Sequence, residues 1–194
     1  MNTYNLHFVV PESERTALRI HFSREGEADR QELERFVSGA FEFTHGAKVT
    51  QFMPCLMSLR DEHNRLVAVC GLRSAGDGPL FLEQYLDQPI EARLTARMGY
   101  AVYRSEIVEV GNFAVAEAGA ARGLVNEIVH QLYTTSKQWA VFTVVPLISN
   151  AFSKMGIQAE ILGEARKECL PLAEQEKWGT YYDQKPKIMA VQRV

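Results

Sequence analysis

The strand-like segment EIVEVGNFAVA, residues 106–116, changes its side-chain alternation in the middle. Apolar residues that share one face stand at even positions before Gly111–Asn112 and at odd positions after it: Val108, Val110, Phe113 and Val115. Because side chains on a strand alternate with a period of two, a regular strand cannot keep one face buried through this change. One extra residue restores the alternation, and glycine favours such a β-bulge. We therefore predict a bulge at Gly111–Asn112, whose unpaired backbone groups suit an extended ligand.

The segment that follows, AEAGAARGL at 116–124, has small side chains where a helix over 120–138 is predicted to begin. The first amides of a helix lack intrahelical partners and carry partial positive charge, so they suit a phosphate. Arg122 adds a charged donor for the same anion. The helix leads to the apolar strand 139–146, which predicts a strand–helix–strand crossover. A plain crossover whose small residues serve only packing is the alternative that the pattern leaves open.

Periodicity and turn residues divide the rest of the chain without a linker or repeat, which predicts one α/β domain over 1–194. Further helices are expected at 27–46 and 147–156, and two short helices separated by a turn at 80–99. Further strands are expected at 6–10, 18–22, 54–60, 65–75, 158–165 and 187–194, of which 54–60 and 65–75 form an antiparallel hairpin. A polar segment with aromatic residues, 174–186, precedes the last strand.

Composition excludes several classes of function. The net charge of −3 gives no electrostatic reason to expect a nucleic-acid partner. No apolar run reaches the roughly 20 residues of an integral membrane segment, and the first residues do not have the pattern of a secretory signal. The three cysteines are far apart, which favours neither a disulfide framework nor a metal site. We therefore expect a cytoplasmic protein.

The order of these elements, the bulged strand and AARGLV at 120–125 resemble the GNAT acyltransferase superfamily, in which the corresponding loop binds the pyrophosphate of coenzyme A. A narrower resemblance rests on LFLEQYLDQPIE, EIVEVGNFA, WAVFT and WGTYY, in this order. These stretches resemble the thermostable haemolysin family of bacterial proteins over residues 30–194. That resemblance implies a GNAT-like fold, with a mixed central sheet and helices on both of its faces. It also implies a distant similarity to acyl-homoserine-lactone synthases.

The resemblance implies acyl transfer from acyl-CoA or an acyl-carrier protein to an amine acceptor, with no tightly bound cofactor and no metal. Glu109 is the candidate base, and Tyr181 or Tyr182 is the candidate proton donor to the departing thiolate. Glu83 and Tyr85 are expected to line an acceptor or acyl pocket. Structural roles stay open for each of these residues: an ion pair, packing of the C-terminal segment, or a helix cap.

Donor binding is assigned to the bulge and to the two helix starts that follow it. A bulge amide is expected to polarise the thioester carbonyl, and Asn150 to bond the pantetheine arm. The candidate residues are Asn112, Phe113, Ala114, Val115, Arg122, Gly123, Leu124 and Asn150. Two other functions stay open: a GNAT-shaped module that binds acyl-CoA without catalysis, and a membrane-damaging haemolysin, as the family name suggests.

Overall fold

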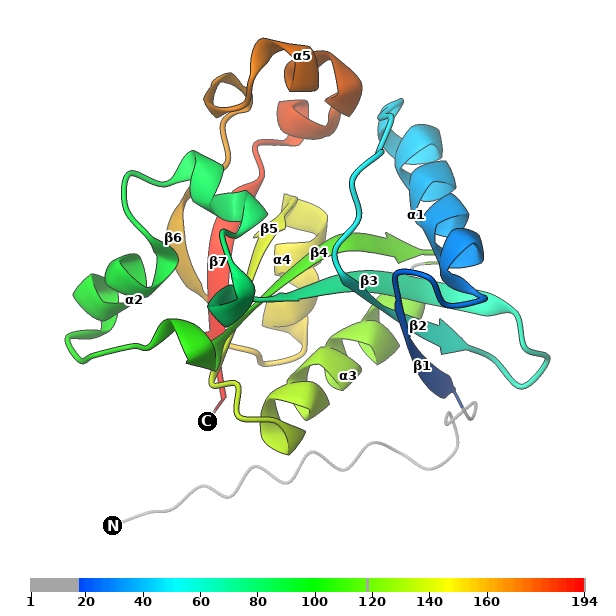
Figure 1. Ribbon diagram of the computed structural model, residues 1–194, viewed down its shortest axis with the longest axis horizontal. Coiled ribbons are helices and arrows are strands. Elements are labelled where there is room, and N and C mark those ends of the chain that lie inside the picture. Colours follow the sequence, from blue (N-terminus) through cyan, green and yellow to red (C-terminus); the bar gives the residue numbers. More distant parts are fainter. Residues whose placement is uncertain (1–17, 118, 194) are drawn as a thin grey trace.

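The computed structural model describes residues 18–117 and 119–193, which form one mixed sheet flanked by helices (Figure 1). The sheet has seven strands in the order β1-β2-β3-β4-β5-β7-β6. Their bounds are β1 Arg19–Arg24, β2 Cys55–Arg60, β3 Leu66–Ser74, β4 Ile107–Val115, β5 Trp139–Val144, β6 Glu160–Glu164 and β7 Lys187–Gln192. β4 and β5 are parallel, and the other neighbours are antiparallel. The predicted hairpin is confirmed as β2–β3, while the strand expected at 6–10 lies outside the described residues.

Helices cover both faces of the sheet, as expected. Their bounds are α1 Arg30–His45, α2 Ile90–Met98, α3 Ala120–Thr134, α4 Pro146–Lys154 and α5 Leu172–Gln175. The apolar side of α3 packs with Met57 and Val110 on one face. Leu33 and Val37 of α1 pack with Val69 on the other face. In the described part of the chain, no helix is both long enough and apolar enough to span a membrane.

The predicted bulge in β4 is confirmed by the register of β3 and β4. Val69 lies opposite Ala114 and Gly71 opposite Gly111, so one residue of β3 faces two residues of β4. Asn112 adopts a positive φ of 47° there, which asparagine tolerates better than most residues. The apolar residues on both sides of the bulge pack into the core beneath α3, namely Val108, Val110, Phe113 and Val115. The extra residue thus keeps these apolar side chains on the face of β4 that packs against α3.

Beyond the bulge, β4 and β5 diverge. Their parallel ladder joins Ile107–Val110 to Trp139–Phe142 and ends there, although β4 continues to Val115 and β5 to Val144. Figure 1 shows the two strands separating past this point. A bulge strengthens local twist and bends its strand, which accounts for the separation.

The polar aromatic segment 174–186 folds into short 3-10 turns, η6 (Glu176–Trp178) and η7 (Tyr181–Gln184). Backbone hydrogen bonds tie this segment to the end of α1. Thr180 N donates to the His45 carbonyl at 2.9 Å, and Lys48 N donates to the Lys177 carbonyl at 2.6 Å. Two segments far apart in the sequence, the end of α1 and residues 177–180, are therefore held together.

Candidate active site

A cavity of about 340 Å³ opens where β4 and β5 diverge. β4 contributes Glu109 to Val115, and the end of β5 contributes Thr143 and Val144. The cavity also reaches residues of α1 and Ile148 of α4, and these two helices lie on opposite faces of the sheet. The opening therefore extends through the sheet at the gap between the strands. The predicted donor-binding residues Asn112, Phe113, Ala114 and Val115 all line it.

A pair of glycines leaves the sheet bare at the bulge, and Met53 covers it. Gly71 and Gly111 lie opposite each other, and a Cβ atom on either would lie within 3.0 Å of the Met53 side chain. The Met53 amide donates to Asn112 Oδ1 at 2.9 Å, and its carbonyl accepts from Arg30 Nη2 at 2.8 Å. The side chain of Asn112 is therefore engaged in holding the cavity wall, and only its backbone remains a candidate for binding the donor.

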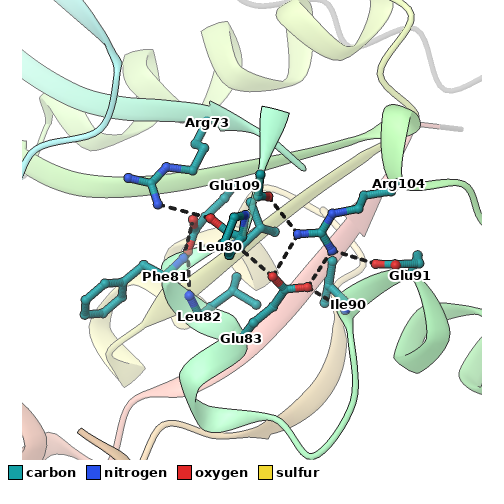
Figure 2. Close-up of polar contacts among 11 residues, drawn as sticks. Arg73, Leu80, Phe81, Leu82, Glu83, Ile90, Glu91, Arg104 and Glu109 are labelled. Atoms are coloured by element: carbon teal, nitrogen blue, oxygen red, sulfur yellow. Dashed lines mark hydrogen bonds and ion pairs between the residues drawn. The ribbon is translucent and has the colours of Figure 1, made fainter. Parts of the chain in front are cut away.

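Glu109 is almost fully buried, at 2% exposure, yet it is one of the residues that line the cavity. Its Oε2 accepts from the Phe81 amide at 2.9 Å and its Oε1 from the Leu82 amide at 2.8 Å (Figure 2). These two amides begin the 3-10 turn η3 (Phe81–Tyr85). Burial raises the pKa of Glu109, although both amides and the charge of Arg73 oppose the shift. A carboxylate with a raised pKa suits a general base at neutral pH.

Glu83 is not among the residues that line this cavity, and its predicted role in binding substrate stays a prediction. It forms a two-pronged ion pair with Arg104, at 2.6 and 2.8 Å, and accepts from the amides of Leu80 and Ile90 (Figure 2). Arg104 also bonds Glu91 at 2.7 Å. This network ties η3 to the start of α2. Glu83 thus holds this turn together.

Acid should weaken the fold through Glu83. Burial alone would raise the pKa of Glu83, but the bonds from Arg104, Ile90 and Leu80 outweigh it and lower the pKa to about 2. A carboxyl group with a lowered folded-state pKa stabilises the fold above its unfolded value near 4.5, and this stabilisation is lost as the pH falls towards 2. We expect Glu83→Gln to flatten the loss of melting temperature between about pH 5 and pH 2. An equally steep loss in the variant would contradict this assignment.

The two candidate tyrosines occupy different environments. Tyr181 lines the cavity, and its hydroxyl donates to the Thr143 carbonyl at 3.4 Å, just beyond the end of the parallel ladder. Tyr182 is buried, and its hydroxyl bonds that of Tyr85 at 2.5 Å. Burial raises the pKa of Tyr181, and it raises the pKa of Tyr182 to about 12. Tyr181 is therefore protonated at neutral pH, and its hydroxyl lies at the cavity wall beside the Thr143 carbonyl. Tyr85 lines the same cavity, and its role in binding substrate stays a prediction.

Several polar residues of the cavity were not predicted from the sequence, among them His45 and Arg73. His45 ends α1, and its ring lies edge-on to Tyr181 with centroids 5.3 Å apart. Burial lowers the pKa of His45, so its ring is neutral at pH 7. Arg73 enters the cavity from β3. Neither residue stands in a recognisable motif, because each acquires its place only through tertiary contacts.

The residues predicted to bind the donor at the two helix starts do not line the cavity. Arg122 and Asn150 are exposed, and Asn150 lies in the middle of α4 rather than at its start. Gly123 packs against the side chains of Leu18 and Leu59, and Leu124 is fully buried in the core. A role in donor binding for Leu124 is thus confined to its backbone. The phosphate-binding role of Arg122 and Gly123 stays a prediction.

The sequence model of one protein family, described as thermostable hemolysin, matches residues 23–194. The chain belongs to the thermostable hemolysin family. No curated protein is similar enough in sequence to refine this assignment.

Solved structures show which fold this family member adopts. FeeM, an N-acyl amino acid synthase from uncultured soil microbes, aligns with a TM-score of 0.61 at 15% identity, covering 91% of this chain and 92% of its own. The acyl-homoserine-lactone synthase LasI aligns with a TM-score of 0.60 at 11% identity, covering 92% and 91%. MesI, a CoA-dependent acyl-homoserine-lactone synthase, aligns with 0.54 at 14%, covering 91% and 89%. The expected GNAT-like fold is confirmed, and at these identities the likeness concerns the fold.

Proposed function

We propose that the protein is an N-acyltransferase that moves an acyl group from a thioester to an amine. The observation that carries this proposal is the placement of Glu109 and Tyr181 in one cavity, at the point where β4 and β5 diverge. One side chain can accept a proton and the other can donate one. The similarly folded proteins FeeM, LasI and MesI are all synthases named for acyl products, which supports acyl transfer as the reaction class.

The reaction follows from these two positions. A thioester lies in the gap between the strands, where a backbone amide at the bulge polarises its carbonyl. The amine nitrogen attacks the carbonyl carbon while Glu109 accepts the proton that the amine loses. The carbon–sulfur bond then breaks, and Tyr181 gives its proton to the departing thiolate. The products are an amide and a free thiol. The proton on Glu109 passes to solvent in the cavity, and the Tyr181 phenolate takes a proton back from solvent, so that both groups regain their starting states.

The cavity suits an acyl chain because apolar side chains dominate its lining. They include Phe41, Val49, Phe52, Met53, Ile148 and Trp178. Pockets lined in this way bind apolar ligands by removing their surface from water. We propose acyl-CoA or an acyl-carrier protein as the donor. Because binding stabilises the folded state, acyl-CoAs of increasing chain length should raise the melting temperature up to the length that the cavity accommodates.

Tyr181→Phe should lower kcat for thiol release by about 10- to 100-fold, since it removes the proton donor but leaves the ring in place. Tyr182→Phe is the matched control, because the hydroxyl of Tyr182 bonds that of Tyr85 and Tyr182 does not line the cavity. We expect it to lower the melting temperature and to leave kcat within about threefold, since a buried hydrogen bond contributes about 1 kcal/mol to stability. The measurement is thiol release from an acyl-CoA series with a panel of amines, with the amide product identified by mass spectrometry.

The outcomes of this assay separate the alternatives. Acyl-CoA that stabilises the protein without turnover on any amine would indicate a binding module. Lysis of liposomes in the absence of any acyl donor would indicate a direct membrane-damaging activity. Either result would overturn the proposed reaction.

A further inference from the structure

Arg73 and Glu109 form a cross-strand pair beside the reaction centre. Arg73 on β3 lies directly opposite Glu109 on β4 in the antiparallel register. Side chains of directly opposed residues project from the same face of a sheet, and both residues line the cavity. Figure 2 shows the guanidinium and the carboxylate on the same side of β4. A cation therefore stands next to the candidate base.

This arginine keeps most of its hydrogen-bonding capacity. In the described ranges its one hydrogen bond runs from Nη1 to the Pro79 carbonyl at 3.3 Å, and it makes no ion pair within 4.0 Å. Arg104, by contrast, bonds two carboxylates and Arg30 bonds one. A guanidinium has five N–H donors in a planar fork that matches a carboxylate. Lys48 and Lys177 also line the cavity, and Lys177 pairs with Glu174, but Arg73 is the cation that lies opposite Glu109.

Glu109 makes no ion pair with Arg73 within 4.0 Å, and each of its oxygens accepts from a backbone amide of η3. The cavity therefore presents a proton acceptor and an unpaired cation side by side. A ligand with an amine and a carboxylate on neighbouring carbons complements this pair, with its amine at Glu109 and its carboxylate on Arg73. A neutral amine would leave the half-buried charge without a partner.

The position of Arg73 also separates it from the predicted phosphate site of the donor. α3 packs on the face of β4 that carries Val108 and Val110. Glu109 alternates with these residues and faces the other side, as does its partner Arg73. The two faces communicate through the gap between the strands. The donor phosphates and Arg73 therefore lie on opposite faces, so that Arg73 is available to the acceptor.

From this geometry we infer that the acceptor is an amino acid, whose carboxylate Arg73 binds while Glu109 takes the proton from its amine. This inference rests on the proposed acyl transfer and specifies its acceptor. The carboxylate fixes the amine at the thioester, because both groups of the ligand are held at once.

Matched acceptors test the inference. Leucine, leucinamide and isoamylamine share a side chain and differ in whether they carry a carboxylate, an amide or neither. We expect the wild-type protein to prefer leucine, and a panel of other amino acids each to exceed its own amide. Arg73→Gln should raise KM for the amino acids by about 10- to 100-fold, since it removes a charged hydrogen bond, and leave KM for isoamylamine unchanged. Arg73→Lys should fall between them. Arg97→Gln is the control, because its ion pair with Glu160 is exposed.

Binding gives a readout that does not need turnover. The amino-acid panel should raise the melting temperature of the wild-type protein and of Arg97→Gln, but not that of Arg73→Gln. If neutral amines are acylated as well as amino acids and Arg73→Gln affects both equally, the inference is overturned while acyl transfer stands. If no amine is acylated, the proposed function fails. The carboxylate site would then be supported by stabilisation that depends on Arg73, and overturned by its absence.

Discussion

Glu109→Gln should lower kcat/KM for acyl transfer by about 10²- to 10⁴-fold, the range that general-base catalysis contributes. Glutamine has nearly the shape of glutamate and cannot accept the proton of the amine. Its side-chain oxygen can still accept from one of the two η3 amides. Acyl-CoA should stabilise the variant as it stabilises the wild type, because Glu109 is assigned to the amine and not to the donor. The loss should therefore appear in turnover, measured as thiol release at saturating donor.

The pH profile distinguishes a base from a structural carboxylate. Because burial raises the pKa of Glu109, acidification should lower the wild-type rate at a pH above the range in which carboxyl groups usually titrate. The pH–rate profile of Glu109→Gln should lack this acidic decline. The raised folded-state pKa also means that the carboxyl group favours folding more as the pH falls, the opposite of Glu83. Glu83→Gln serves as the control, since it removes another carboxylate that bonds near η3 and that does not line the cavity. Equal rate losses in both variants would show that Glu109 only holds η3 in place.

Glutamine also introduces a side-chain NH₂ group opposite the second η3 amide. A buried amide without a partner costs about 1–3 kcal/mol, so the variant should melt at a lower temperature. Assays well below that temperature keep unfolding out of the measured rate.

The bulge was predictable because its signal is local. A strand with its alternation interrupted at Gly111–Asn112 has few ways to keep one face buried, and an extra residue is the simplest. The use of the glycines was not predictable. Gly71 and Gly111 are 40 positions apart in the sequence, and only their pairing across β3 and β4 shows that they make room for Met53.

The site itself was only partly readable from the sequence. Glu109 and Tyr181 were identified through the resemblance, but nothing local separates Tyr181 from the adjacent Tyr182, whose hydroxyl turns to Tyr85 instead. Glu83 was assigned to the pocket because it lies in a stretch that marks the family. Its bonds with Arg104 show that this stretch also contains residues that hold a turn together. His45 and Arg73 gained their positions from packing between distant segments, which periodicity does not report.

The end of α1 and the aromatic segment 174–186 are hydrogen-bonded to each other, and both line the cavity. Gly179 is the position in this segment where a side chain has least space. Gly179 has a positive φ of 49°, and a Cβ atom there would lie 2.0 Å from the His45 carbonyl oxygen and 2.9 Å from the Gly46 carbonyl carbon. These neighbours are backbone atoms, which cannot rotate away as a side chain would. A larger residue must therefore push the segment off the end of α1 and break the hydrogen bond between Thr180 and His45.

Gly179→Ala should lower the free energy of unfolding by about 2–4 kcal/mol, because strain at a positive φ adds to a backbone clash. Gly39→Ala on α1 is the matched control: its Cβ would meet nothing within 4 Å, so the same change should stabilise the helix by about 0.5–1 kcal/mol. Urea unfolding measures both values. Hydrogen exchange should show faster exchange at Thr180 and Lys48 in Gly179→Ala only, and kcat should fall with it because Tyr181 leaves the end of β5. If Gly179→Ala has wild-type stability and slow exchange at Thr180, then contacts other than those with the end of α1 hold segment 174–186 in place. Tyr181 would then not depend on α1 for its position in the cavity.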